Sequence, residues 1–139
     1  GRVIVQTSTP DHPAIRSATA HDYEAFIRSE LPIRKTLLYP PFGNVIRLII
    51  RSLHEETAVE WASFLAKQLR KEGEQIQDIR ILGPAPCPIT RLRDRFRYHI
   101  QIHGPDCHEL RDLVLRATSS AQTPKNVAWI IDVDPIDML

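Results

Sequence analysis

The most concentrated functional chemistry in the sequence is a short run rich in arginine. Arg91, Arg93, Arg95 and Arg97 alternate with other residues, and Asp94 is the acidic residue among them. If the run is extended, the four arginines lie on one side of the strand, roughly 7 Å apart. Such a row can follow a phosphate backbone. The run therefore predicts a nucleic-acid contact; the alternative is an interface with another protein domain, where arginines pair with carboxylates.

Two further groups extend this candidate surface. Tyr98, like Phe96, could stack on bases if it faced outward. Arg47 and Arg51 lie in a segment rich in Val and Ile, and they share a face with aliphatic residues. A face that mixes arginine with aliphatic residues suits contact with another domain better than open solvent. We count Tyr98, Arg47 and Arg51 among the DNA-binding candidates, with contact to another domain as the alternative for the two arginines.

Other kinds of chemistry find little support. Cys87 stands alone in a proline-rich stretch and Cys107 is followed directly by His108, so the ligand pairs of a zinc site are missing. None of the five glycines forms a phosphate-binding loop followed by Lys and Ser or Thr. Asp132 and Asp134 lie two residues apart on an expected strand, so their side chains share a face. They could bind a cation, but a solvated strand end paired with Lys or Arg is favoured.

The composition limits the class of protein and the kind of binding that these residues can support. The 139 residues suit one domain, and 42% hydrophobic and 25% charged residues are ordinary for a globular protein. The formal net charge is only +1, so any nucleic-acid binding must come from local clustering. No apolar run reaches the roughly 18 residues of a membrane span, and we expect a cytoplasmic location with no membrane partner.

The first third of the chain predicts a strand and a helix. Residues 3–7 favour a strand, which would lack a preceding element to pair with and so indicates a truncated protein. Ala14 to Leu31 favours a helix that Pro32 interrupts. We expect three parts: 1–20, the end of a preceding domain or a linker; 21–43, a linker helix and a turn; and 44–139, a C-terminal domain.

From Asn44 onward the pattern predicts the order βαββαβ. The expected strands are 44–52, 78–82, 95–103 and 127–133, the second leading into a proline-rich edge or loop. The first helix is expected to start at a capping box of Ser52 and Glu55. Apolar residues at helical spacing mark both helices: Ala58, Trp61, Ala62, Leu65, Ala66 and Leu69 in the first, and Leu110, Leu113, Val114 and Ala117 in the second. This order is that of a ferredoxin-like α+β sandwich, with two helices on one face of a four-stranded antiparallel sheet. The other face is expected to be open to a partner.

Several phrases together resemble the primosomal protein N′ (PriA) family of replication-restart DNA helicases. One is Pro10-Asp11-His12-Pro13 after the first expected strand, and a second is Tyr39-Pro40-Pro41-Phe42-Gly43, preceded by Asp22-Tyr23-Glu24-Ala25-Phe26. The third group is Gly83-Pro84-Ala85-Pro86, Arg95-Phe96-Arg97-Tyr98 and Ile131-Asp132-Val133-Asp134-Pro135. The resemblance covers nearly the whole chain and implies that residues 1–20 are the end of the second helicase lobe or a linker.

The resemblance implies an ATP-dependent 3′→5′ DNA helicase that restarts stalled replication forks in the bacterial cytoplasm. Its implied partners are forked or single-stranded DNA, single-stranded DNA-binding protein, other primosome proteins and the upstream helicase lobes. The family's ATP-binding and DEAH-type motifs and its zinc-binding insertion have no counterpart in this sequence. We therefore expect no catalytic residue and no cofactor here, with ATP, Mg²⁺ and zinc confined to upstream domains.

Within this resemblance the chain is expected to be a C-terminal DNA-binding and docking domain. The alternative is a protein-interaction module that docks on the helicase lobes or on single-stranded DNA-binding protein without touching DNA. The turn of Tyr39, Pro40, Pro41 and Phe42 is interpreted as a rigid docking hinge, with a direct DNA contact as its alternative. Asp132 and Asp134 belong to the same structural group.

Overall fold

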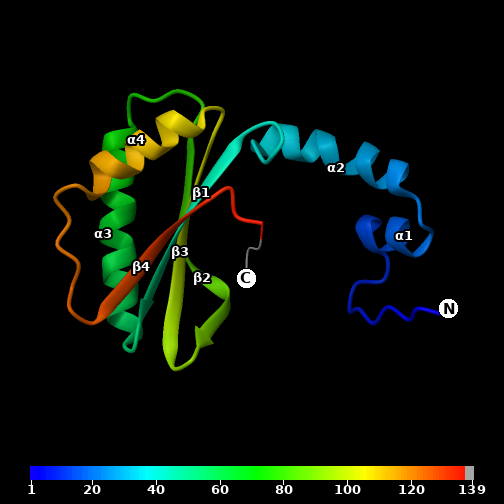
Figure 1. Cartoon of the computed structure of the whole chain (residues 1–139), viewed down its shortest axis with the longest axis horizontal. Helices are drawn as coiled ribbons and strands as arrows, with labels where there is room; N and C mark the ends of the chain where they lie inside the picture. Colours follow the sequence, from blue (N-terminus) through cyan, green and yellow to red (C-terminus); the bar gives the residue numbers. More distant parts are fainter. Residues whose placement is uncertain (137–139) are drawn as a thin grey trace. The chain divides into compact units, whose positions relative to one another are not determined.

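The computed structural model describes residues 1–136 and divides the chain into two compact units (Figure 1). The first unit, Gly1–Leu37, contains helices α1 (Pro13–Thr19) and α2 (Tyr23–Leu37). The second unit begins at Leu38. Its elements are β1 (Asn44–Ser52), α3 (Glu55–Gly73), β2 (Arg80–Leu92), β3 (Arg95–Gly104), α4 (Cys107–Thr118) and β4 (Val127–Val133).

The strand predicted for residues 3–7 does not form. This segment is irregular, and the Val3 side chain is 87% exposed. A strand is stable only when its backbone groups pair with a neighbouring strand, and within the described part of the chain this segment has no such neighbour. A β-favouring composition is insufficient without that partner.

The single helix predicted for residues 14–31 is also wrong, because the chain forms two helices. The break lies at His21, whose φ of 54° falls in the left-handed region. Asp22 then starts α2, since its carboxylate accepts a hydrogen bond from the amide of Ala25 at 2.9 Å. The start of α2 lies close to residue 21, where the linker helix was expected to begin.

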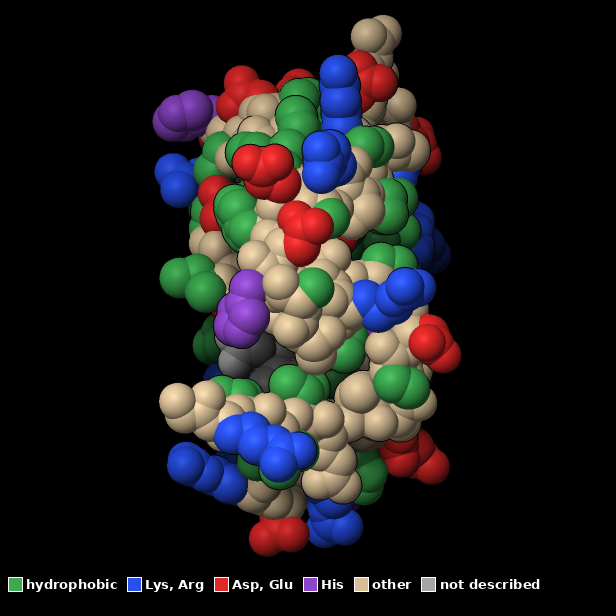
Figure 2. All heavy atoms as spheres, turned by 90° about the vertical axis from the view of Figure 1, so that its right-hand side faces the viewer, with side chains coloured by type: hydrophobic (Ala, Val, Ile, Leu, Met, Phe, Trp, Pro, Cys, Tyr) green, Lys and Arg blue, Asp and Glu red, His purple; other side chains and the backbone are tan. Residues whose placement is uncertain are grey.

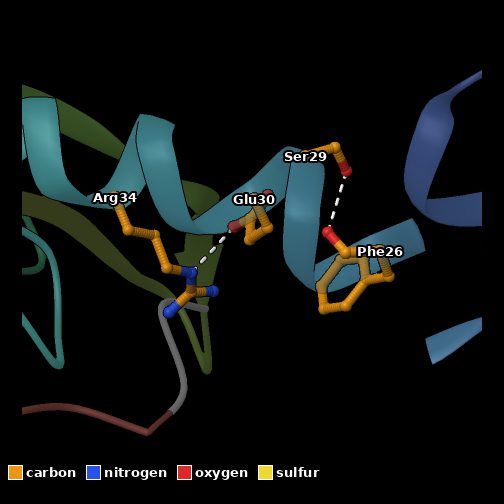
Figure 3. A network of polar contacts seen from close by, with 4 residues as sticks. All are labelled: Phe26, Ser29, Glu30 and Arg34. Carbon is orange, nitrogen blue, oxygen red and sulfur yellow. Dashed lines mark hydrogen bonds and ion pairs between the residues drawn. The ribbon is translucent and has the colours of Figure 1, made fainter. Parts of the chain in front are cut away.

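Pro32 lies inside α2 instead of interrupting it. A proline within a helix removes one backbone donor, while the bonds of the following residues can still form. Side-chain bonds support the surrounding turns, as Figure 3 shows. The Ser29 hydroxyl donates to the carbonyl of Phe26 at 2.8 Å, and the Arg34 guanidinium donates to the Glu30 carboxylate at 2.9 Å across Pro32.

The second unit has the predicted α+β architecture. Its elements follow the order βαββαβ, and the sheet order is β2-β3-β1-β4 with every neighbouring pair antiparallel. Helices α3 and α4 lie on the same side of the sheet (Figure 1). We call the sheet surface toward these helices the helix face and the opposite surface the second face.

The hydrophobic core lies between the helices and the helix face. Alternate residues of the central strands supply one side of it, as the sequence pattern predicts: Ile46, Leu48, Ile50, Ile100 and Ile102 are fully buried. The apolar stripes of the helices supply the other side, namely Ala58, Trp61, Ala62, Leu65, Ala66 and Leu69 from α3 and Leu110, Leu113, Val114 and Ala117 from α4. The predicted helix stripes are therefore confirmed.

The predicted capping box at the start of α3 is wrong. The N-cap residue is His54, and its amide donates to the Ser52 hydroxyl at 3.2 Å. Ser52 cannot serve as the cap because it is still the last residue of β1, paired with both neighbouring strands. The Glu55 carboxylate accepts a hydrogen bond from the Tyr98 hydroxyl at 2.7 Å, so it joins the helix to β3.

Strand β2 is longer than predicted, because it continues through the proline-rich stretch to Leu92. Of the two alternatives predicted for this stretch, an edge or a loop, the structure has an edge strand, since β2 pairs with β3 alone. An edge strand tolerates proline because the missing donor can face away from the ladder. Register shifts between Leu82 and Ala85 and between Pro86 and Arg91 accommodate the irregular backbone.

Candidate nucleic-acid interface

The arginine run spans the turn that connects β2 to β3. Leu92 pairs with Arg95, and the two residues between them have φ values of 50° for Arg93 and 60° for Asp94. Positive φ at both central residues characterises the two-residue turns that match the twist of antiparallel strands. We call Arg91, Arg93 and Arg95 at this turn the hairpin tip.

The expectation that all four arginines lie on one side is therefore wrong. Arg91 pairs with Phe96, so its side chain belongs to the helix face, whereas Arg95 and Arg97 belong to the second face. Arg93 lies in the turn itself. The alternation holds only within a continuous strand, and here the chain reverses at Arg93.

The three arginines of the hairpin tip are exposed. The Arg91 guanidinium carbon lies 5.3 Å from the centre of the Phe96 ring, within the range of a cation–π contact. Nη2 of Arg91 donates to the carboxylate of Asp94 at 3.2 Å, and this ion pair is solvent-exposed. Exposed pairs of this kind contribute at most about 1 kcal/mol, so they leave Arg91 available to a phosphate.

Arg97, in contrast, is withdrawn from solvent and only 8% exposed. Its guanidinium donates to the carbonyl of Ile89 at 3.4 Å. Arg51 is its cross-strand partner on the second face, so the two cations lie side by side. The Nε atom of Arg51 is buried and has no hydrogen-bond partner among residues 1–136.

Arg47 is the most deeply buried charged residue, with 0% exposure on the second face. Its Nε atom donates to Nδ1 of His99 at 3.2 Å, and Nη2 lies 3.7 Å from the sulfur of Cys87. Burial lowers the pKa of His99, and the positive charges of Arg47 and Arg97 lower it further. The second face is therefore closed around Arg47, which corrects the expectation of an open face for the central strands, while Ile130 on β4 stays 44% exposed.

His103 lies on the same face and is buried by the turn that begins at Tyr39. The Tyr39 ring meets the imidazole edge-on, with a centroid distance of 4.8 Å and an interplanar angle of 79°. Nε2 of His103 lies 3.1 Å from the side-chain oxygen of Gln101. Burial lowers the pKa of His103, as does the charge of Arg80, while the Leu38 backbone opposes the shift.

The rest of this turn is short and tight. The amide of Phe42 donates to the carbonyl of Tyr39 at 3.0 Å across Pro40 and Pro41. Phe42 itself remains partly exposed. The structure thus brings Tyr39 to the sheet and leaves Phe42 at the surface, on a segment apart from the hairpin tip.

The two aspartates at the end of β4 have different surroundings. Asp132 lies opposite Arg47 in the antiparallel register. Asp134 follows the strand with φ 48°; its amide donates to the carbonyl of Val45 at 2.7 Å, and its carboxylate accepts from the Val45 amide at 2.9 Å. The partner of Asp134 is therefore the β1 backbone instead of the expected Lys or Arg, and this pair closes the end of the ladder.

Tyr98 lies on the helix face, away from Arg95 and Arg97. It packs against the core and donates its hydroxyl proton to Glu55. The hydrogen bond to Glu55 raises the pKa of Tyr98 above its ordinary value of 10.0, and burial and the negative charge of Glu55 act in the same direction. Tyr98 thus lies on the opposite face from Arg95 and Arg97, while Arg91 shares the helix face with it.

Sequence reasoning did not identify the buried polar group formed by Arg47, His99 and Cys87. Its signal was an arginine within an otherwise apolar strand, which in a sheet buried on one face requires polar partners nearby. His99 was assigned only to the polar side of β3. The pairing register places it beside Arg47, and that register depends on contacts far apart in the sequence.

Charges of both signs are spread over the face drawn in Figure 2, where Lys and Arg lie among Asp and Glu. This agrees with a formal net charge of +1. Among residues 1–136, His, Cys, Asp and Glu form no group of three or more that could hold a metal ion. None of the helices in that range is long and apolar enough to cross a membrane.

The sequence matches known proteins along its length. The family described as primosomal protein N C-terminal domain matches residues 35–136. Proteins named replication restart protein PriA are similar over nearly the whole chain: 34% identity over 99% of it in Synechocystis, 33% over 100% in Bacillus subtilis and 31% over 100% in Treponema pallidum. The chain spans 16%, 17% and 21% of these relatives, respectively.

Proposed function

The chain belongs to the family of primosomal protein N C-terminal domains, and from this membership we propose that it is a DNA-binding and docking domain of a replication restart helicase. The complete protein would be an ATP-dependent 3′→5′ DNA helicase that reloads the replication machinery at stalled forks in the bacterial cytoplasm. ATP, Mg²⁺ and zinc would bind in its other domains. Single-stranded DNA-binding protein and other primosome proteins would be its partners.

The observation that carries the DNA-binding proposal is the hairpin tip. Arg93 lies in a two-residue turn, Arg91 and Arg95 lie on the two strands beside it, and all three are exposed to solvent. Guanidinium groups at a protruding turn can reach phosphates without opening the fold. Because Arg47 and Arg97 are buried, we limit the proposed phosphate contacts to the three arginines of the tip.

The same geometry argues against base stacking by Tyr98. Its hydroxyl donates a hydrogen bond to Glu55. The negative charge of this carboxylate beside the ring would repel a phosphate backbone. The proposed contact is therefore electrostatic and independent of DNA sequence. Its affinity should decrease with rising salt, since each neutralised phosphate releases condensed counterions.

A salt titration of two variants and the parent tests this proposal. The variant R91Q/R93Q/R95Q should bind a labelled single strand more weakly than the parent. The slope of log affinity against log salt should decrease in magnitude by about 1–2, because each lost contact on a single strand removes about 0.7. Fluorescence anisotropy with two strands of unrelated sequence should give equal losses.

The matched control is K67Q/R111Q/K125Q, which removes the same number of positive charges from exposed residues of α3, α4 and the segment before β4. Its slope should remain close to that of the parent. Equal slopes for the hairpin variant and the parent, with both proteins folded by circular dichroism, would refute DNA contact through the tip.

A second candidate function is docking onto the rest of a longer protein, and the first unit favours it. Neither α1 nor α2 contains a buried residue, and Tyr23, Ile33 and Leu37 are exposed. An apolar stripe without a core is expected to pack against another surface. Hydrogen exchange of the α2 amides should be at least about tenfold slower in a longer natural chain than in this one. Equal rates would exclude this docking.

A further inference from the structure

An open groove lies on the helix-face side of the second unit, where β1 leads into α3. Its volume is about 720 Å³, and its apolar lining comes from Leu53, Val59, Phe96 and Tyr98. Leu53 is 53% exposed although it follows a buried strand directly. The groove therefore presents aliphatic and aromatic surface that the core does not use.

Three carboxylates border this apolar surface: Glu55, Glu56 and Glu60. His54 is the remaining lining residue, so the lining contains neither Lys nor Arg. Within residues 1–136 none of the three glutamates forms an ion pair. The groove is thus acidic at its rim, whereas the neighbouring hairpin tip is basic.

Helix capping does not account for all three glutamates. Glu55 and Glu56 lie in the first turn of α3, where the helix dipole favours negative charge. Glu60 lies beyond that turn and is four residues after Glu56, a spacing at which like charges repel. A cation bound between Glu56 and Glu60 would relieve this repulsion, and the apolar surface beside them would receive a hydrophobic side chain.

The position of Arg91 supports this view of the groove. Its guanidinium lies over the Phe96 ring, which is one of the lining aromatic rings. The ring therefore already accepts one cation from its own chain at the border of the groove. Nucleic acid is the wrong ligand for the remaining surface, because its phosphates would face three carboxylates.

From this combination we propose that the groove is a docking site for a partner protein's segment in which basic and apolar residues alternate. Its apolar side chains lie against Leu53 and Phe96, and its Lys or Arg side chains pair with Glu56 and Glu60. Charge complementarity selects this partner over an acidic peptide or a DNA strand. The DNA contact assigned to the hairpin tip is a separate proposal, although Arg91 of the tip borders this groove through Phe96.

The direct test uses a short labelled peptide of alternating Arg and Leu as the probe for the whole chain. We expect saturable binding in fluorescence anisotropy, and amide chemical shift changes confined to residues 53–60 and 96–98. The same peptide with Glu in place of Arg should not bind. The variant E55Q/E56Q/E60Q should bind the Arg–Leu peptide about tenfold more weakly, since each exposed ion pair contributes modestly.

Matched controls separate a local site from the field of the whole protein. The variant E24Q/E74Q/E109Q removes three exposed carboxylates elsewhere and should weaken binding by about twofold or less, because salt screens distant charges. Leu53→Ser should weaken binding by about fivefold, while Leu82→Ser, at a residue of similar exposure (49%), should have no effect.

Three outcomes would overturn the proposal. If E55Q/E56Q/E60Q and E24Q/E74Q/E109Q weakened peptide binding equally, the effect would come from the net charge of the protein and not from the groove. Shift changes outside the groove would place the peptide elsewhere. An increase in molecular mass with protein concentration, abolished by E55Q/E56Q/E60Q, would show that a second copy of this chain occupies the groove.

Discussion

The helix face and the second face of the same sheet both bury residues, but they bury different chemistry. On the helix face Ile46, Leu48 and Ile100 pack against α3 and α4. On the second face Arg47 and His103 reach comparable burial without a helix layer above them. Burial on the helix face follows the apolar pattern of the sequence. Burial on the second face requires that the polar groups form hydrogen bonds with one another.

This difference means that the two faces should respond to different perturbations. A core of aliphatic and aromatic side chains is sensitive to lost volume and insensitive to pH. A buried polar group is sensitive to the loss of a partner and to protonation. The following variants and conditions test that contrast, from the largest expected effect to the smallest.

Trp61→Ala should produce the largest loss of stability. The side chain is 8% exposed and belongs to the core between α3 and the sheet. Truncation of a buried tryptophan costs about 3–5 kcal/mol, through lost burial and the cavity that remains. Chemical denaturation monitored by circular dichroism at 222 nm would measure it. A midpoint equal to that of the parent would mean that the core does not depend on α3 as described.

Arg47→Ala should destabilise the second face by about 2–3 kcal/mol, because it leaves a cavity and removes the donor to His99. Arg47→Met should cost less than Arg47→Ala, since an apolar side chain of similar length fills the space. Arg111→Ala, at an exposed position of α4, is the control and should change the free energy of unfolding by less than about 0.5 kcal/mol. A larger loss for Met than for Ala would contradict this account of the site.

Acidification should destabilise the fold through the second face. The folded-state pKa values of His99 and His103 lie below the ordinary 6.5, chiefly because both are buried. The unfolded chain therefore binds protons first as pH falls. This contribution to stability is fully present above pH 6.5 and is lost as pH falls from 6.5 through the lowered pKa values. Proton NMR titration of the imidazoles checks the direction, and either ring titrating above 6.5 would contradict it.

Tyr98→Phe should have the smallest effect, a loss of about 0.5–1 kcal/mol, because one hydrogen bond at the rim of the helix face disappears. The same hydrogen bond also affects the pKa of Tyr98 in the parent protein. Glu55→Gln should move the pKa of Tyr98 down toward 10.0, since the hydrogen bond and the charge that raise it both come from Glu55. Ultraviolet titration of the phenol measures the shift; an unchanged pKa would show that Glu55 does not control this ring.

The parts of the fold that could be predicted from the sequence are those decided within one element. Strand β1 follows from its richness in Val and Ile, and the stripe of α3 follows from the period of apolar residues, which reflects side-chain geometry along a helix. Residues 3–7 and Pro32 were misjudged for the opposite reason. Whether a β-favouring segment forms a strand depends on a partner, and whether a proline ends a helix depends on the contacts beyond it.

For the candidate interface, the sequence alone determined the family resemblance, the arginine-rich composition of the β2–β3 segment and the apolar side of β3. The tertiary structure decided which arginines are available: Arg93 lies in the turn, Arg97 is buried, and Arg47 is enclosed beside His99. The physical reason is that alternation along a strand is local, while the position of a chain reversal and the register between strands depend on the whole sheet.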